Sequence, residues 1–236
     1  MRLSIVIPVF NEEKTIVEVV RRVLSVPLPV DEREIIIVDD GSVDGTVGKI
    51  KSQIANLKST KLLEQNTNQG KGAAVRRGFA EATGDAVIIQ DADFEYDPAD
   101  MVQMLEPLLA GKADVVYGSR FVTNRPRRVL YNTHYLANRL ITLLSNIFSG
   151  LNLSDIETGY KLFSASALKA ILSCLTATRF GIEVELTAQI AKHRLSVYEV
   201  GISYNGRTYE EGKKIGWSDG LAALWHIVRY NVFTRS

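Results

Sequence analysis

Short apolar runs rich in Val and Ile alternate with segments of helical periodicity, and this alternation restricts the fold more than any other feature of the sequence. A continuous β-branched run is typical of a strand buried on both faces, whereas apolar residues three and four positions apart indicate a helix packed on one side. The runs interpreted as strands are residues 3–9, 34–38, 60–64, 87–90 and 114–118. Their regular succession predicts an α/β, Rossmann-like fold with a mostly parallel sheet and helices on both faces.

The rhythm changes after Arg120, where helical segments become longer and more amphipathic. We expect the first helix of the chain to be capped by Asn11, because Asn accepts hydrogen bonds from the free amides of a helix start. The later helices are expected at residues 130–151, 165–172, 181–192 and 217–233, and the later strands at 158–163 and 195–202. The sequence contains no internal repeat or linker and therefore predicts one compact unit with a carboxyl-terminal extension.

The overall charge argues against nucleic acid as a partner. With 28 basic and 27 acidic residues, the formal net charge of +1 lacks the excess that binding to a polyanion requires. Cys174 is the single cysteine, which excludes an internal disulfide and fits a reducing compartment. No signal sequence precedes Leu3, and no window approaches the roughly 18 apolar residues of a membrane span. We therefore expect a cytoplasmic protein, or one peripheral to a membrane.

Polar clusters follow three of the expected strands, at the edge of a parallel sheet where ligands usually bind. They are Asn11-Glu12-Glu13, Asp39-Asp40 and Asp91-Ala92-Asp93. Side chains two residues apart in a strand share a face, so Asp91 and Asp93 converge and suit a hard cation. A solvated acidic turn is the alternative for any one cluster, but three together indicate a shared acidic pocket that needs a cation.

Two common nucleotide motifs are excluded. Lys71 lies between two glycines at a helix start, like the lysine of a phosphate-binding loop. That loop requires a glycine at position 66 and a hydroxyl residue at position 72, where this chain has Asn66 and Gly72. No dinucleotide motif of the form G-x-G-x-x-G follows the first strand, so a dehydrogenase is disfavoured.

The polar clusters belong to longer motifs that follow one another in a fixed order. These motifs are Pro8-Val9-Phe10-Asn11-Glu12-Glu13, Asp39-Asp40-Gly41-Ser42-Val43-Asp44-Gly45-Thr46, Asn68-Gln69-Gly70-Lys71-Gly72, Asp91-Ala92-Asp93, Gly118-Ser119-Arg120 and Thr158-Gly159-Tyr160-Lys161. The first four look like the successive signatures of the family 2 glycosyltransferases, which have the GT-A fold. The last two resemble the polyprenyl-phosphate glycosyltransferases, the dolichol-phosphate mannose synthase-like branch of that family. The resemblance covers nearly the whole chain, from Leu3 to about Tyr230.

The resemblance implies a nucleotide-sugar donor, GDP- or UDP-linked, at the strand ends. It assigns the donor to Pro8, Asn11, Glu12, Glu13, Asp39, Asp40, Lys71, Asp91, Ala92 and Asp93. It also implies Mg²⁺ or Mn²⁺ on Asp91 and Asp93, with Glu95 as a third ligand, to neutralise the leaving diphosphate. Other interpretations remain open, namely helix-end charge for Glu12 and Glu13, a helix cap for Asp40, and simple exposure for Glu95.

The resemblance further implies a polyprenyl or dolichyl phosphate acceptor. It assigns the acceptor phosphate to Arg120, Arg207, Lys213 and Lys214, whose cationic groups suit an anion held beside a diphosphate. A phosphate monoester is ionised at neutral pH and needs no base, so Asp155 either orients the acceptor or acts as a base, with a helix cap as the alternative. Asp93, Asp155 and Arg120 are thus the candidate catalytic residues. Of Glu183 and Glu185, two apart in a helix, we expect at most one to face the pocket.

Two amphipathic helices are candidates for binding the membrane surface at which a polyprenyl phosphate is found. Segments 130–151 and 217–233 combine apolar stripes with aromatic residues such as Trp217 and Trp225, as membrane-surface helices do. Packing onto the protein core would use the same stripes. We expect residues 1–204 to form the catalytic domain and residues 205–236 a basic loop and amphipathic helix packed on that domain or on a membrane surface.

Together these patterns predict a metal-dependent, inverting transfer of a hexose, mannose or glucose, from a nucleotide sugar to a polyprenyl phosphate. Transfer to a saccharide hydroxyl is an alternative, although neither Trp217 nor Trp225 has the Gln-x-x-Arg-Trp context of polysaccharide synthases. A nucleotide-sugar binding module without turnover is a second alternative, and the presence of both Asp91 and Asp93 opposes it. The sequence does not predict an oligomeric state.

Overall fold

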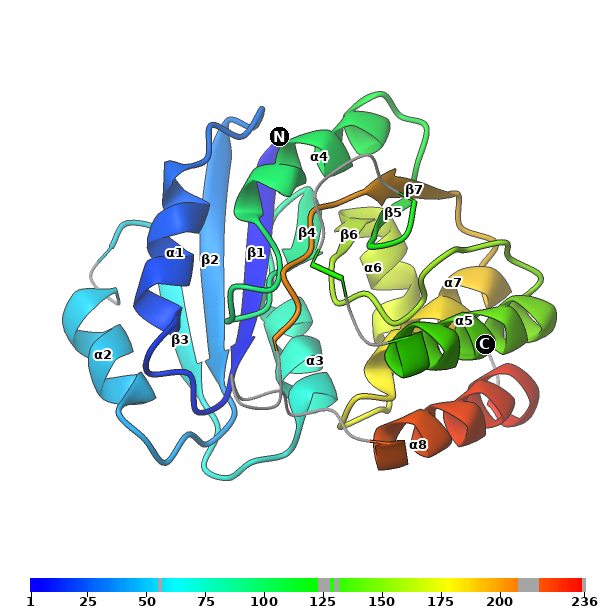
Figure 1. The fold of residues 1–236 in the computed structure, drawn as a ribbon. Helices are drawn as coiled ribbons and strands as arrows, with labels where there is room; N and C mark the ends of the chain where they lie inside the picture. Colours follow the sequence, from blue (N-terminus) through cyan, green and yellow to red (C-terminus); the bar gives the residue numbers. More distant parts are fainter. Residues whose placement is uncertain (55–56, 123–127, 130–131, 208–216, 235–236) are drawn as a thin grey trace.

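A seven-stranded sheet forms the centre of the protein, with helices on both faces (Figure 1). The computed structural model describes residues 1–54, 57–122, 128–129, 132–207 and 217–234. Across the sheet the strand order is β3-β2-β1-β4-β6-β5-β7. The strands are β1 (Arg2–Val9), β2 (Glu32–Asp39), β3 (Thr60–Glu64), β4 (Ala86–Ile89), β5 (Val115–Ser119), β6 (Lys161–Ser164) and β7 (Val197–Gly201).

The sheet is mostly parallel, as the alternation of strands and helices predicted. The pairs β1–β2, β2–β3, β1–β4 and β5–β7 are parallel. Strand β6 is antiparallel to both of its neighbours, β4 and β5, so these two run in the same direction. The prediction of a mostly parallel sheet is therefore confirmed, and the reversal of β6 was not expected.

Alternate residues of the central strands supply two separate cores. In β2, Ile35 and Ile37 face one side of the sheet while Ile36 and Val38 face the other, because successive side chains of a strand point to opposite faces. One core packs on α1 (Ile16–Ser25), α2 (Thr46–Gln53) and α4 (Met101–Leu109), which follows the 3₁₀ turn η1 (Pro98–Asp100). The opposite core packs on α3 (Lys71–Glu81), α5 (Asn132–Ser149), α6 (Ala165–Leu172), α7 (Ile182–Lys192) and α8 (Trp217–Val228) with the π-helical turn η2 (Arg229–Phe233).

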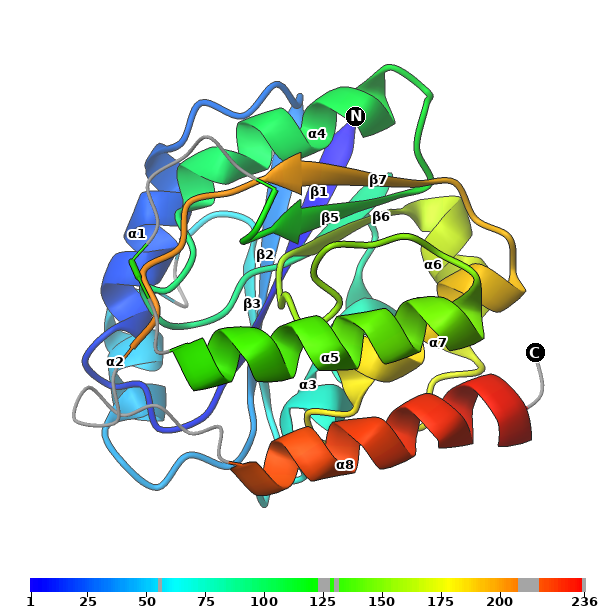
Figure 2. The same ribbon diagram turned by 45° about the vertical axis from the view of Figure 1, so that its right-hand side comes forward.

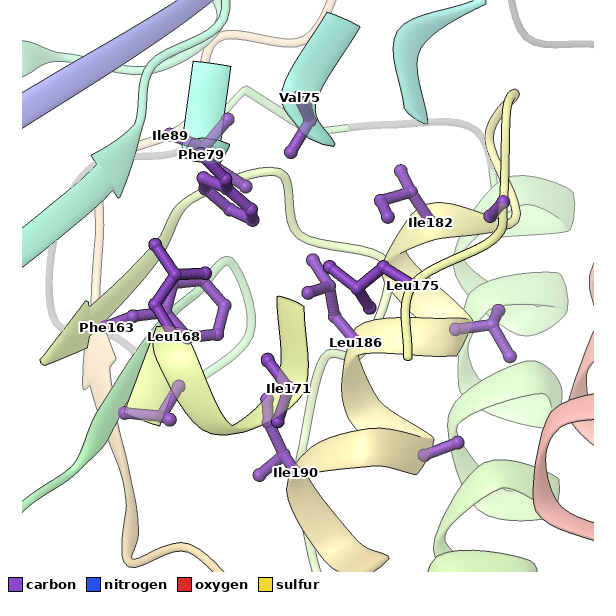
Figure 3. Close-up of a cluster of buried hydrophobic side chains, with 14 of the residues drawn as sticks. Val75, Phe79, Ile89, Phe163, Leu168, Ile171, Leu175, Ile182, Leu186 and Ile190 are labelled. Carbon is purple, nitrogen blue, oxygen red and sulfur yellow. The ribbon is translucent and has the colours of Figure 1, made fainter. Parts of the chain in front are cut away.

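The second core is a continuous apolar cluster between the sheet and helices α3, α6 and α7 (Figure 3). Phe79 of α3 meets Phe163 of β6 edge to face, with ring centroids 5.6 Å apart. Helix α3 approaches β1 closely because residue 78 is glycine. A Cβ atom there would lie 2.3 Å from Cγ1 of Val6. Any larger side chain at position 78 would therefore push α3 away from β1.

Two local expectations were wrong. Asn11 does not cap the first helix, since α1 begins at Ile16 after Thr15, and Asn11 has a φ of 51° in the left-handed region. Asn is one of the few residues that adopt the left-handed conformation readily, and it is also a common helix cap. The presence of Asn in the sequence therefore does not distinguish a left-handed turn from a helix start. The strand expected at residues 158–163 begins only at Lys161, and Thr158 to Tyr160 belong to the loop before it.

Helices α5 and α8 lie side by side on the outside of the molecule (Figure 2). Helix α8 also contacts α7, so the carboxyl-terminal segment packs against the helices of the second core. Lys213 and Lys214 lie outside the described residues, as does the side chain of Trp217. Each helix in the described part of the chain is too short or too polar to traverse a bilayer.

Candidate functional site

The polar segments after β1 and β2 are joined by hydrogen bonds at the carboxyl edge of the sheet. The backbone N–H of Asn11 donates to Oγ of Ser42 at 2.9 Å, and the N–H of Val43 donates to Oδ1 of Asn11 at 2.9 Å. Glu13 accepts from the N–H of Gly45 at 2.9 Å. The side chains of Asn11 and Glu13 therefore hold two loops together, and their contact with a nucleotide sugar stays a prediction.

The two aspartates at the end of β2 have different tasks. Asp40 is buried and accepts hydrogen bonds from the N–H groups of Gln69 and Gly70, both at 2.8 Å, so it holds the loop that starts α3. Asp39 uses Oδ2 to accept from the N–H groups of Gly41 and Ser42. Its Oδ1 is enclosed and accepts no hydrogen bond from the described residues. Of the pair, Asp39 has the oxygen that suits a ligand hydroxyl or amide.

Lys71 links the segment after β4 to helix α7. Its Nζ lies 2.8 Å from Asp91 and 3.0 Å from Glu183. Burial alone would lower the pKa of Lys71, but these two carboxylates raise it well above its ordinary range, so the ammonium stays charged. Glu185 points elsewhere and accepts from the N–H groups of Thr176 and Ala177. Only Glu183 of this pair reaches the site, in agreement with the helical spacing.

Arg207 connects the segment after β7 to the acidic clusters. Its guanidinium donates to Asp93 at 2.6 Å and to Glu12 at 3.1 Å. Glu95 accepts from the backbone N–H of Arg207 at 2.9 Å and from the hydroxyl of Tyr204 at 3.0 Å. The cation predicted for an acceptor phosphate thus lies among donor-side carboxylates, and its role at a phosphate stays a prediction.

Asp91 and Asp93 fit a divalent cation by their chemistry. Burial, with the charges of Asp91 and Glu95, raises the pKa of Asp93 to about 7, although Arg207 opposes this rise. Negative charge at this strand end therefore exceeds what one guanidinium offsets, and carboxylate oxygens are the ligands that Mg²⁺ and Mn²⁺ prefer. In the described part of the chain, no three His, Cys, Asp or Glu side chains are grouped to hold a metal. The metal role of Glu95 accordingly stays a prediction.

Arg120 and Asp155 form a buried two-point ion pair beside these clusters. Nε and Nη2 of Arg120 donate to the two oxygens of Asp155 at 2.6 and 2.7 Å, and the Arg120 backbone N–H donates at 3.1 Å. The guanidinium also lies 5.2 Å from the ring centroid of Tyr204. Asp155 has no exposed side-chain surface, so this carboxylate orients Arg120.

The loop before β6 reaches the site through a glycine. A Cβ atom at Gly159 would lie 2.5 Å from Oδ2 of Asp91 and 3.1 Å from Nζ of Lys71, so the backbone is in direct contact with that ion pair. The sequence motif around Gly159 pointed to the site without indicating this contact. Sequence reasoning missed Glu157, whose pKa is raised to about 7 by burial and by Glu183. A single acidic residue in a loop carries no periodic signal that would mark it as partly buried.

Pro8 and Ala92 lie in the framework around the site, and their contact with a donor stays a prediction. Pro8 lies within β1, opposite Val38 of β2, and Ala92 is buried in the core on the α1 side. Asp44 accepts from the N–H of Thr46 at 3.0 Å, so these two residues stabilise the turn at the start of α2. The structure therefore brings together the strand-end carboxylates, Lys71, Arg207 and the Arg120–Asp155 pair.

Comparisons with known proteins identify the family of this chain. The family model described as Glycosyl transferase family 2 matches residues 4–172. The chain is 29% identical over 239 residues to an undecaprenyl-phosphate mannosyltransferase from Micrococcus luteus, covering 100% of this chain and 96% of that protein. It is 28% identical over 237 residues to a polyprenol monophosphomannose synthase from Mycolicibacterium smegmatis, covering 98% of this chain and 87% of that protein.

A solved structure with the same fold is glucosyl-3-phosphoglycerate synthase from Mycobacterium tuberculosis in complex with Mn²⁺, UDP-glucose and phosphoglyceric acid. The two chains superpose with a TM-score of 0.72 at 22% identity, over 100% of this chain and 81% of that chain. This likeness shows the GT-A fold. Since the family model covers well over half of the sequence, the chain belongs to glycosyl transferase family 2 and is a glycosyltransferase.

Proposed function

We propose that this glycosyltransferase moves a hexose from a GDP- or UDP-linked donor to a polyprenyl phosphate, with inversion at the sugar carbon. The observation that carries the proposal is the position of two cationic groups at opposite ends of one loop. Arg120 pairs with Asp155 at its start, and Lys71 contacts Gly159 near its end. A leaving and an attacking phosphate group each need a cationic partner, and Lys71 and Arg120 would supply one to each. Relatives that cover the whole chain are named for transfer to undecaprenyl and polyprenol phosphates.

On the donor side, Asp39 and Glu12 would bind the nucleoside, and Lys71 would hold the diphosphate. The free Oδ1 of Asp39 suits a ribose hydroxyl or a base N–H. Asp91 and Asp93 would hold Mg²⁺ or Mn²⁺, which supplies charge neutralisation for the leaving diphosphate. Arg207 already pairs with Asp93 and Glu12, so the same guanidinium is within reach of a bound diphosphate.

On the acceptor side, Arg120 would orient the attacking phosphate. An ionised phosphate monoester is already a nucleophile, so no side chain has to remove a proton. Both oxygens of Asp155 accept hydrogen bonds from Arg120. We therefore assign Asp155 to the orientation of Arg120, and not to the role of general base.

We also propose that α5 and α8 place the protein on a membrane surface, where a polyprenyl chain is found. Apolar side chains on α5 recur at spacings of four, three and four residues and form one stripe. Each of them is more than half exposed, as are three apolar residues of α8 and η2. The exposed residues are Leu136, Leu140, Leu143 and Ile147 on α5, and Trp225, Val232 and Phe233 on α8 and η2.

Replacing Leu140 and Leu143 with Asp is expected to reduce binding to vesicles by roughly 10-fold or more, because each buried Leu contributes about 1.5–3 kcal/mol of apolar transfer energy. Binding is measured by co-sedimentation with lipid vesicles. Ala165→Asp combined with Ala170→Asp, which adds the same two negative charges on the exposed surface of α6, is the matched control. Equal vesicle binding by the double variant and the control would contradict the membrane proposal.

The acceptor is tested by a panel of labelled UDP- and GDP-sugars with polyprenyl phosphate, with and without Mn²⁺. We expect label in the lipid fraction for one donor, with little transfer when the metal is chelated. Label that appears only in a polar saccharide would replace the lipid acceptor with a hydroxyl acceptor. No turnover with any donor would favour a binding module.

A further inference from the structure

The segment from Asp155 to Gly159 spans the two ends of the proposed reaction path. Its first residue pairs with Arg120, and its last is in contact with Asp91 and Lys71. The sugar that is transferred must lie between the leaving diphosphate and the attacking phosphate. Glu157, in the middle of this segment, has no part in either ion pair. Its carboxyl group therefore remains available to the sugar that lies between these two ends.

Two carboxyl oxygens near this path are enclosed by protein and accept no hydrogen bond from the described residues. They are Oε1 of Glu157 and Oε2 of Glu183. Buried polar atoms almost always have a partner, so each unpaired oxygen needs an explanation. Glu183 is tied to the same segment through Lys71, whose Nζ lies 3.0 Å from Oε1 of Glu183 and 3.1 Å from the position of a Cβ atom at Gly159, two residues after Glu157. Two acceptors at one site suit a ligand that brings several hydroxyl donors.

A buried lysine fixes the backbone on both sides of Glu157. Nζ of Lys161 donates to the carbonyl oxygen of Ile156 at 3.0 Å and to that of Thr158. The same ammonium lies 4.8 Å from the ring centroid of Tyr117, which covers it. Arg120 and Asp155 are the other charged groups close enough to influence Glu157. The loop is thus held in place before any ligand arrives, as a specificity-determining side chain requires.

We propose that Glu157 is a specificity-determining residue whose carboxyl group binds a hydroxyl of the transferred hexose and rejects sugars that carry a carboxylate. This inference rests on the proposed function, because it places the sugar between Asp91 and Arg120. A hydroxyl of a neutral hexose donates to the free Oε1. The carboxylate of a hexuronate would lie against the acidic side chain of Glu157, and juxtaposed like charges are unfavourable in a water-poor site. The charge of Glu183 is already paired with Lys71 at 3.0 Å and adds little to this repulsion.

Glu157→Gln tests this assignment because the amide keeps the size of the side chain and removes its charge. Binding of UDP-glucose and UDP-glucuronate, and of GDP-mannose and GDP-mannuronate, is measured by calorimetry on the full chain with Mn²⁺. We expect the wild type to prefer the neutral sugar of the pair it binds by roughly 10- to 100-fold, the range for one hydrogen bond to a charged group. In the variant this ratio should fall at least about 10-fold, with weaker hexose binding and tighter hexuronate binding.

Three further measurements separate specificity from a loss of structure. The affinity for UDP or GDP alone should stay within about twofold of the wild type, because the nucleoside diphosphate does not reach Glu157. Glu157→Asp, which keeps the charge on a shorter side chain, should weaken hexose binding without admitting hexuronates. Glu106→Gln, on the exposed surface of α4, should leave every affinity unchanged.

The assignment is overturned if Glu157→Gln weakens all ligands equally, nucleoside diphosphate included, or if the wild type shows no preference between the two sugars of a pair. These outcomes are distinct from a failure of the proposed function. Donor binding is measured without an acceptor, so a clear sugar preference with no label in lipid would overturn the acceptor alone. Label in lipid with an unchanged ratio in the variant would overturn the role of Glu157 alone.

Discussion

Asp93→Asn is expected to lower kcat/KM for sugar transfer by about 100- to 1,000-fold, the scale for removing one preorganised electrostatic group from an active site. The amide keeps the shape of the side chain but loses the charge that pairs with Arg207 at 2.6 Å. In the proposed reaction the same change removes an anionic ligand of the divalent cation. The measurement is steady-state transfer at several Mn²⁺ concentrations, and the Mn²⁺ concentration for half-maximal rate should rise in the variant.

Asp97→Asn is the matched control for this variant. Asp97 is exposed a few residues further along the chain and accepts from the N–H of Ala99 at 3.0 Å, a role that Asn also performs. We expect its activity to remain at the wild-type level. Full activity of Asp93→Asn at every Mn²⁺ concentration would show that neither the cation nor Arg207 acts through this carboxylate.

Arg120→Ala is expected to reduce the free energy of unfolding by about 3–5 kcal/mol, because it leaves the charge of Asp155 buried without a partner. The Asp155 side chain has 0% exposure and that of Arg120 13%, so solvent offers little compensation. The same variant should lose at least about 100-fold in transfer rate, since the acceptor phosphate loses its guanidinium. Urea unfolding and transfer to polyprenyl phosphate measure the two effects separately.

Combining Arg120→Ala with Asp155→Asn separates the effect of Arg120 on the free energy of unfolding from its effect on the transfer rate. The neutral amide removes the buried charge, so the double variant should recover most of the lost stability but none of the lost activity. Arg22→Ala serves as the comparison, because its ion pair with Glu18 is exposed, at 54% and 48%, and such pairs contribute less than about 1 kcal/mol. A fully active double variant would remove Arg120 from the proposed mechanism.

The strands and most helices were predictable because their apolar periodicities are strong and local. The run from Glu34 to Val38 is apolar at every position but the first, and it forms the central part of β2, buried on both faces. The reversed direction of β6 was not predictable in this way. Periodicity reports which residues are buried, and it contains no information about the partner of a strand or its direction.

The sequence predicted which clusters of polar residues lie at the site, but it did not predict the role of each residue within a cluster. Asp39 and Asp40 are adjacent and chemically alike, yet one has a free oxygen and the other holds the start of α3. That division depends on loop contacts with residues 41–42 and 69–70, which no local pattern specifies. Glu157 was missed for the same reason, because the enclosure of its Oε1 results from packing between distant segments.

The reversed direction of β6 determines the edge of the sheet at which the loop before this strand lies. Leu162 of β6 pairs with Ile88 of β4 and with Val116 of β5. An antiparallel strand starts at the edge where its parallel neighbours finish. The chain therefore enters β6 from the reactive side of the sheet, and the connection that carries Asp155, Glu157 and Gly159 arrives there directly. Had this strand been parallel, the same connection would have opened on the far edge, and Arg120 would have no carboxylate to hold it.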